Sequence, residues 1–270
     1  MSCSAPLVTF ELLKQEGGAP FGVVSLNAPA SHNRLTPALL ADFNAALDRA
    51  ETAGAAVLLI RAEGAQFCTG GDVSLFLAAA RENRAETFAD TLVGALHALL
   101  LRLIAFPGPV ITCAQGAITG GGAGLLFAAD VTLLSEDAFL QPYYGTVGFA
   151  PDGGWTALLP GRIGAQAAGQ WLLQDRRVTA HEAAQLGLSS APCAAETLSN
   201  AGYALARSLS QPARLHTARA TKALLWTEAA QAAAKAGLAA EQAAFREAIA
   251  RPHTRAAMEA FCSQRQTADV

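Results

Sequence analysis

Short apolar runs occupy the first two thirds of the chain, and segments with helical spacing separate them. The runs at 8–12 and 21–26 predict two strands joined by a Gly-Gly turn. The runs at 56–60 and 109–113 predict two further strands, and each leads directly into a glycine-rich turn. Shorter strands are expected at 131–134 and 138–140, and a short helix at 121–129. This alternation of strands and helices indicates a layered α/β core.

Capping signals and leucine spacing mark the helices between these strands. Thr36 followed by Pro37 is typical of a helix N-terminus. In residues 85–106 leucines recur at three- and four-residue intervals, which predicts a long helix that the following Pro-Gly-Pro ends. Thr179 and Glu182 have the spacing of a capping box.

From about residue 197 onward the pattern is almost wholly helical. We therefore divide the chain into an α/β core at 1–195 and a helical C-terminal region at 196–270. No low-complexity segment separates the two parts. The C-terminal region is expected to serve packing and oligomerisation.

Composition and charge mainly exclude classes of function. Apolar residues make up 52% of the 270 residues, enough for a packed interior. The formal charge of −3, with no basic run, argues against nucleic-acid binding. No apolar run reaches the roughly 20 residues of a membrane helix, and no signal peptide is evident. We expect a cytoplasmic protein that does not bind a membrane.

The five cysteines are scattered, form no Cys-x-x-Cys pair and have no histidine at zinc spacing. This pattern predicts a reducing compartment and no metal site. Cys68 and Cys113 lie in apolar surroundings and are expected to be small buried side chains.

Two glycine-bearing turns carry the clearest chemical signal. They are residues 67–72, Phe-Cys-Thr-Gly-Gly-Asp, and residues 116–122, Gly-Ala-Ile-Thr-Gly-Gly-Gly. Glycine permits sharp turns and lets a ligand approach the backbone amides closely. Two such turns can direct two N–H groups at one oxygen, which is how an oxyanion is stabilised. The alternative is that these glycines only make tight turns.

Both turns resemble signatures of the crotonase (enoyl-CoA hydratase/isomerase) superfamily. Residues 67–73 are similar to its Phe-Cys-Ala-Gly-x-Asp-Leu signature, and residues 116–122 to its second signature. The likeness runs from Asn33 through 151–154 and 179–188 to about residue 265. It implies a spiral of ββα units and a homotrimer or hexamer. It also implies an acyl-CoA thioester as substrate, with no cofactor beyond the coenzyme A that the substrate carries.

The resemblance implies that the backbone N–H groups of Gly71 and Gly121 stabilise the thioester oxygen as it becomes an enolate. Hydratases of the family have two glutamates near this site, and Gly124 and Tyr143 stand at their positions here. Neither residue can act as a carboxylate base, so addition of water is weakly supported. The segment between 139 and 148 is one residue longer than in the isomerases, which leaves Tyr144 as the alternative to Tyr143.

Asp152 is a carboxylate at a third family position, in a Pro-Asp-Gly-Gly segment that resembles isomerase members. A single carboxylate suits a 1,3-proton shift, because it can take a proton at the α-carbon and return it at the γ-carbon. An apolar pocket would disfavour the ionised form and make it a better base. The alternative is a turn and N-cap role. His97, within a leucine-rich helix, is expected to be structural.

The other candidate residues fall into two groups. Those expected to bind the acyl part of the substrate are Thr69, Asp72, Phe76, Gly124, Tyr143, Phe149 and Trp155. Those expected to contact coenzyme A are Arg34, Leu35, Lys222 and Phe261. Asp72 also stands where a helix starts, and a phenylalanine in an amphipathic helix is more often a core residue.

From these features we expect an enoyl-CoA isomerase in which Asp152 moves the proton. The first alternative is an enoyl-CoA hydratase. The second is a non-catalytic acyl-CoA-binding paralogue, which the glycine at 124 and the tyrosine at 143 favour. The sequence does not indicate which acyl group is bound.

Overall fold

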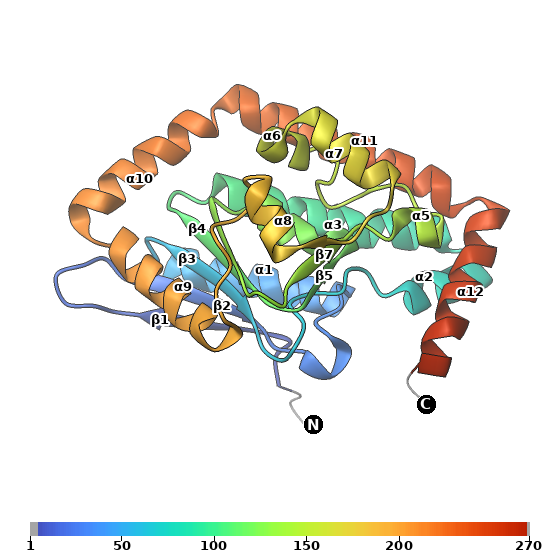
Figure 1. Ribbon diagram of the computed structural model, residues 1–270, viewed down its shortest axis with the longest axis horizontal. Coiled ribbons are helices and arrows are strands. Elements are labelled where there is room, and N and C mark those ends of the chain that lie inside the picture. The colour runs from blue at the N-terminus through green and yellow to red at the C-terminus, as the bar shows by residue number, and fades with distance from the viewer. Residues whose placement is uncertain (1–4, 269–270) are drawn as a thin grey trace.

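A five-stranded sheet forms the centre of the structure, a computed structural model that describes residues 5–268 (Figure 1). The strands lie in the order β1-β2-β3-β4-β6, with β1 antiparallel to β2 and the other neighbours parallel. Their bounds are β1 Val8–Leu13, β2 Phe21–Leu26, β3 Leu58–Ala62, β4 Val110–Ala114 and β6 Val131–Leu134. Central parallel strands are buried on both faces, which explains why their sequences are continuous apolar runs.

Helices cover both faces of this sheet, because successive side chains of a strand point to opposite faces. On one face, Leu58 belongs to a buried cluster with residues of α1 (Pro37–Thr52) and α3 (Ala85–Ala105). On the other face, Leu59 belongs to a second cluster with residues of α9 (Ala195–Leu209). The layered α/β fold that the sequence predicts is therefore confirmed.

The structure also contains a second, smaller sheet. It contains β5 (Ala117–Thr119), β7 (Phe139–Gln141) and β8 (Val178–Thr179), in the order β5-β7-β8. β5 is parallel to β7, and β7 is antiparallel to β8. The short helical elements around it are η1 Pro29–Ser31, η2 Gly120–Ala123, α4 Gly124–Phe127, α5 Tyr144–Val147, α6 Leu159–Ile163, α7 Ala165–Leu173 and α8 Ala180–Gln185.

One helix in the described part of the chain, α3, is long and apolar enough to cross a membrane by length and composition. Its side chains Leu92, Leu96 and Leu99 are buried. It packs against α1, against α2 (Val73–Arg81) and against α11 (Glu228–Ile249). Helices that are apolar on most sides also occur in protein cores, and the packing of α3 is that of a core helix.

The helical C-terminal region continues from α9 through α10 (Pro212–Leu225) and α11 to α12 (Pro252–Ala268). Figure 1 shows α10 and α11 crossing one side of the molecule and α12 lying beside α2. Leu238 and Phe245 of α11 belong to the same buried cluster as α3, so this region packs on the core. Its role in oligomerisation stays a prediction.

Local signals predict most element ends correctly. The Thr36 hydroxyl accepts a hydrogen bond from the Leu39 amide at 3.1 Å, and Thr179 with Glu182 forms both bonds of a capping box. The strand predicted at 56–60 begins at Leu58, and the helix predicted at 121–129 is η2 followed by α4. Its glycines favour α-helix weakly, which accounts for the short 3-10 turn.

The two cysteines expected in the interior, Cys68 and Cys113, are both buried. Burial raises the pKa of each thiol to about 12, so neither is reactive at neutral pH. Cys3 lies outside the described residues. The cysteines here therefore act as small apolar side chains.

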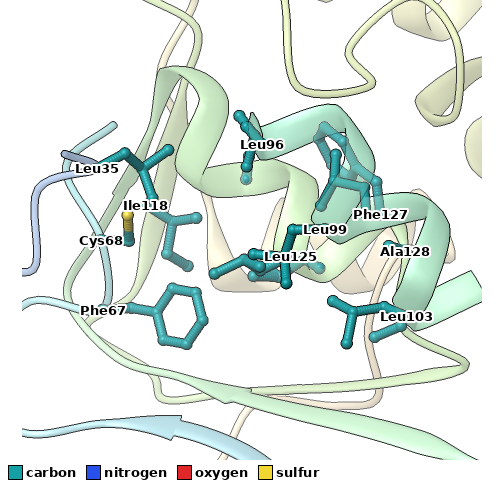
Figure 2. Packing of buried hydrophobic residues seen from close by; sticks show 14 of the residues in the cluster. Leu35, Phe67, Cys68, Leu96, Leu99, Leu103, Ile118, Leu125, Phe127 and Ala128 are labelled. Atoms are coloured by element: carbon teal, nitrogen blue, oxygen red, sulfur yellow. The ribbon is translucent and has the colours of Figure 1, made fainter. Parts of the chain in front are cut away.

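Part of the main core lies directly under the two glycine turns. Figure 2 shows Leu35, Cys68 and Ile118 close together, with Leu96 of α3 and Leu125 of α4 beside them. All five are 2% exposed or less. Because well-packed interiors resist displacement, this cluster holds the backbone of both turns in place.

Candidate active site

The two glycine turns meet through their backbones. Cys68 and Ile118 form a parallel bridge, in which the Thr119 amide donates to the Cys68 carbonyl at 3.0 Å. Two residues further along each segment, Gly70 and Gly120 have φ angles of +73° and +49°. A Cβ on Gly70 would lie 2.7 Å from the Thr119 oxygen, so a side chain does not fit. Glycine is needed here for conformation and for close approach.

The Gly71 amide faces away from its neighbouring strand. Leu35 receives the flanking hydrogen bonds: its amide donates to the Gly70 carbonyl at 2.8 Å, and its carbonyl accepts from the Asp72 amide at 3.4 Å. The Gly70 carbonyl and the Gly71 N–H belong to one planar trans peptide and point in opposite directions, so the N–H of Gly71 points away from Leu35. Gly71 lines the pocket described below.

Gly121 presents the second amide at the same pocket. It stands in the first turn of η2, where N–H groups have no acceptor within the helix. Within residues 5–268, neither the Gly71 nor the Gly121 amide has a backbone acceptor. Both glycines line one cavity, so the two predicted donors are brought together.

Asp152 lies beside the second turn and is only 8% exposed. A methyl group on Gly121 would be 3.2 Å from its Oδ1 and 3.5 Å from its Oδ2. The Tyr144 hydroxyl donates to Oδ1 at 2.5 Å and also lies 3.0 Å from the Asp152 carbonyl oxygen. Of the two tyrosines that the sequence leaves open, Tyr144 is the one that bonds the carboxyl.

The surroundings of Asp152 raise the pKa of its carboxyl to about 7. Burial is the largest cause, the Tyr144 hydrogen bond opposes it, and the nearby charge of Glu241 adds to the rise. The pKa of Tyr144 is well above its usual value, because of burial and then of the Asp152 charge. Tyr144 is therefore a neutral donor, and Asp152 can exchange a proton near neutral pH.

The turn that carries Asp152 is fixed against the second glycine turn. Gly153 and Gly154 have φ angles of +63° and +89°, which glycine adopts readily. A Cβ on Gly153 would lie 2.7 Å from the Cα of Gly121. The indole N–H of Trp155 donates to the Gly120 carbonyl at 2.8 Å. Trp155 is fully buried and anchors this turn. It does not line the pocket, although the sequence predicts that it would.

A pocket that opens to solvent joins these groups. Its far wall is aromatic: the rings of Phe76, Phe149 and Phe245 contact one another with centroids 4.8 to 5.5 Å apart. The lining residues are Thr69, Gly70, Gly71, Val73, Phe76, Thr119, Gly120, Gly121, Pro142, Tyr143, Tyr144, Val147, Phe149, Asp152, Phe245 and Phe261. Such a pocket suits an apolar ligand that ends in a polar carbonyl.

Four predicted acyl-binding residues line this pocket: Thr69, Phe76, Tyr143 and Phe149. Two others lie outside its lining. Gly124 packs under the Asp152 turn, where a Cβ would be 2.4 Å from the Gly153 oxygen. Asp72 caps α2, with its Oδ1 accepting from the Ser74 amide at 3.0 Å, as its position at a helix start indicates.

The residues assigned to coenzyme A are dispersed, and the structure does not support the assignment of Lys222. Its ammonium group is buried, pairs with Asp130 at 2.8 Å and donates to the carbonyls of Leu103 and Gly108. A buried charge with these partners is not free to meet a phosphate. The side chain is a structural element between α10 and the core.

The other three assignments to coenzyme A have different outcomes. The Leu35 side chain is a core residue, 2% exposed. Arg34 is partly exposed and pairs with Asp72 at 3.2 Å. Phe261 lines the pocket, with its ring 6.4 Å from that of Tyr143.

Two residues of α11, Phe245 and Glu241, belong to the site although no pattern in the sequence indicates them. Phe245 completes the aromatic wall, and the Glu241 carboxylate accepts hydrogen bonds from the segment after Asp152. Both lie in an alanine-rich helix about ninety residues further along the chain, where local pattern predicts only an amphipathic helix. Their roles depend on the packing of α11 against α3.

Comparison with known proteins supports the assignment of this fold. The family model described as enoyl-CoA hydratase/isomerase matches residues 16–268. The enoyl-CoA hydratase/isomerase family protein YhaR of Bacillus subtilis is 30% identical over 165 residues, which are 61% of this chain and 63% of that protein. Human chromodomain Y-like protein is 32% identical over 178 residues, 66% of this chain and 29% of its own length. The matched region thus spans less than two thirds of the length of each of these relatives.

Solved structures give the same fold. An enoyl-CoA hydratase from Bacillus halodurans superposes with a TM-score of 0.83, over 93% of this chain and 99% of that one, at 21% identity. At that identity the likeness concerns the fold alone. The match of the family model over nearly the whole chain carries the assignment further: the chain belongs to the enoyl-CoA hydratase/isomerase (crotonase) family.

Proposed function

We propose that this protein is an enoyl-CoA isomerase that converts a 3-enoyl thioester into the conjugated 2-enoyl thioester. The observation that carries the proposal is Asp152, the one acidic residue in the pocket lining, which is buried beside Gly121 and has a pKa of about 7. Neither Gly124 nor Tyr143 supplies a second carboxylate. One carboxyl that exchanges a proton at neutral pH matches the need of a 1,3-proton shift.

In the proposed reaction, the thioester oxygen accepts hydrogen bonds from the Gly71 and Gly121 amides. The ionised Asp152 removes a proton from the α-carbon, and the C–H electron pair forms a dienolate whose negative charge lies on that oxygen. Each amide then contributes roughly 3 kcal/mol of transition-state stabilisation. The protonated Asp152 returns the proton at the γ-carbon, which yields the conjugated double bond and restores the carboxylate.

Hydration of a 2-enoyl thioester is the alternative, and the Tyr144 hydroxyl is the observation that favours it. Hydration needs one group to activate water and one to protonate the α-carbon. Asp152 and Tyr144 are two such groups in contact. However, the hydroxyl already donates to Asp152, and its raised pKa opposes its use as an acid. A silent acyl-CoA-binding paralogue is the third alternative.

We also propose that the protein acts in the cytoplasm without a cofactor, as a homotrimer or hexamer. Exposed apolar side chains on the C-terminal region support the oligomer: Leu224 and Leu225 are 78% and 69% exposed. Leu225 also lines a groove with Leu209 and Trp226. Exposed apolar surface of this kind is typical of subunit interfaces.

Incubation with a panel of 2-enoyl, 3-enoyl and arylacetyl thioesters in D₂O, read by mass spectrometry, tests the proposed reaction. We expect deuterium uptake at the α- or γ-carbon and a shift of the double bond without addition of water. Addition of one water to the 2-enoyl thioester would favour hydration instead. Binding without any change in either enoyl isomer would favour the silent paralogue.

The pH dependence of isomerisation is a second expected result. Asp152 must be ionised to take the α-proton, so kcat/KM should rise about tenfold per pH unit below pH 7 and level off above it. The Tyr144 hydrogen bond lowers the Asp152 pKa, so Tyr144→Phe should move this acid limb to higher pH. Tyr203→Phe, on α9, is the matched control and should leave the limb in place. An unmoved limb in Tyr144→Phe would contradict the assignment of Asp152.

A further inference from the structure

The Glu241 carboxylate of α11 binds the segment that follows Asp152. Oε1 accepts from the Thr156 amide at 2.6 Å, the Thr156 hydroxyl at 2.7 Å and the Ala157 amide at 2.9 Å. Oε2 accepts from the Gly154 amide at 2.8 Å. Glu241 is 3% exposed, so these four donors replace water around a buried charge. The carboxylate is thus buried against the turn and is not a surface group.

His97 of α3 binds the remaining amide of this turn. Its Nε2 accepts from the Gly153 amide at 3.1 Å, so that nitrogen carries no proton. Burial lowers the pKa of His97 to about 4, and the ring is neutral at pH 7. A backbone group of Leu238, in α11, opposes this lowering of the His97 pKa. His97 therefore has a defined task besides filling the core.

Together these two side chains determine the course of residues 153–157. Four amides of this irregular segment end on Glu241 or His97, which come from two helices packed against each other. The same segment presses Gly153 against Gly121. A shift of the turn would therefore move the Asp152 carboxyl relative to the Gly121 amide. Displacements of about 1 Å at a reacting group reduce rates roughly a hundredfold.

The Glu241 charge also acts on Asp152 directly. Of the groups around Asp152, Tyr144 from α5 and His97 from α3 are neutral at pH 7, and Glu241 from α11 is acidic. Burial raises the pKa of Glu241, and its hydrogen bonds from the turn oppose that rise. Its negative charge disfavours a second charge on Asp152 and strengthens the carboxylate as a base. The burial of Glu241 limits screening of this effect by solvent.

We propose that Glu241 and His97 are positioning residues of the site, which hold the Asp152 carboxyl beside Gly121. This inference rests on the function proposed above. Neither residue lines the pocket, so both act through Asp152 and its turn.

The first test measures the titration of the Asp152 carboxyl and needs no reaction. In protein labelled with ¹³C at the aspartate carboxyls, the Asp152 signal is the one missing from Asp152→Asn. In Glu241→Gln its titration midpoint should move to lower pH, because the repelling charge is gone. An unchanged midpoint would overturn the proposal. Because this measurement needs no substrate, it decides the inference even if the protein isomerises no enoyl thioester.

The second test uses the pair His97→Gln and His97→Leu. Glutamine can accept the Gly153 hydrogen bond, and leucine of similar size cannot. We expect His97→Leu to lower kcat roughly 10- to 100-fold with little change in KM, and His97→Gln to restore most of the loss. Equal activity of the two variants would overturn the proposal. If Glu241→Gln does not fold, this pair still decides it.

Ser210→Ala is the control for loss of a buried hydrogen bond. The Ser210 hydroxyl is buried at the end of α9 and donates to the Ala206 carbonyl at 2.8 Å. We expect this variant to lose thermal stability like His97→Leu but to keep kcat. If it loses kcat to the same extent, the effect of His97 is general destabilisation and the proposal is wrong.

Discussion

Replacing Asp152 with alanine should lower kcat for isomerisation of a 3-enoyl thioester by roughly 10²- to 10⁴-fold, the range typical of general acid–base catalysis. The carboxyl has no substitute, because Tyr144 is neutral and the other lining residues carry no acid. KM should change little, since the oxyanion donors and the aromatic wall remain. Stopped-flow absorbance of the conjugated product measures the effect.

Two variants define the origin of this loss. Asp152→Asn keeps the size of the side chain and removes the proton exchange, so it should be as inactive as Asp152→Ala. Asp137→Asn makes the same change at an exposed aspartate away from the pocket and should be fully active. Isomerisation at the wild-type rate in either Asp152 variant would sink the mechanism.

Gly121→Ala should lower kcat roughly 10²- to 10³-fold, comparable to removing one oxyanion donor. The added methyl group would lie 2.8 Å from Leu96 Cδ2 and 3.2 Å from Asp152 Oδ1. The first distance is too short and the second is tighter than an ordinary contact, so the Leu96 side chain and the Asp152 carboxyl must both shift. Since the amide stabilises the enolate while the carboxyl moves the proton, one methyl group disturbs both functions.

Gly169→Ala is the matched control, because it adds the same methyl group in α7 with nothing within 4 Å. Alanine favours helix over glycine by about 1 kcal/mol, so this variant should be active and no less stable. Circular dichroism would confirm that Gly121→Ala keeps the fold. Full activity in folded Gly121→Ala would contradict a catalytic role for the second glycine turn.

The sequence predicts the two glycine turns and Asp152 well because these depend on local chemistry. Positive φ at Gly70 and Gly120, and the turn after Asp152, need glycine at those positions. Apolar runs predict the buried strands for a similar reason, since parallel strands exclude polar side chains on both faces. In each case the residue type itself carries the structural requirement.

The incorrect assignments concern residues whose partners are distant in sequence. Lys222 looks like a free cation in the sequence, and only its packing against Asp130 makes it a buried ion pair. Trp155 looks like a pocket residue, but its indole binds the Gly120 carbonyl, 35 positions earlier. Side-chain direction in irregular segments has no period that a pattern could reveal.

The amino-acid sequence by itself determined the layered α/β fold, the paired glycine turns and the acidic residue between proline and glycine. Only the tertiary structure decided that Tyr144 donates to Asp152, that Phe245 closes the pocket and that Glu241 and His97 hold the turn. The physical reason is the distance along the sequence over which the relevant interactions act. Backbone conformation and strand burial follow from neighbouring residues, whereas the pKa of Asp152 follows from desolvation and charge supplied by helices far along the chain.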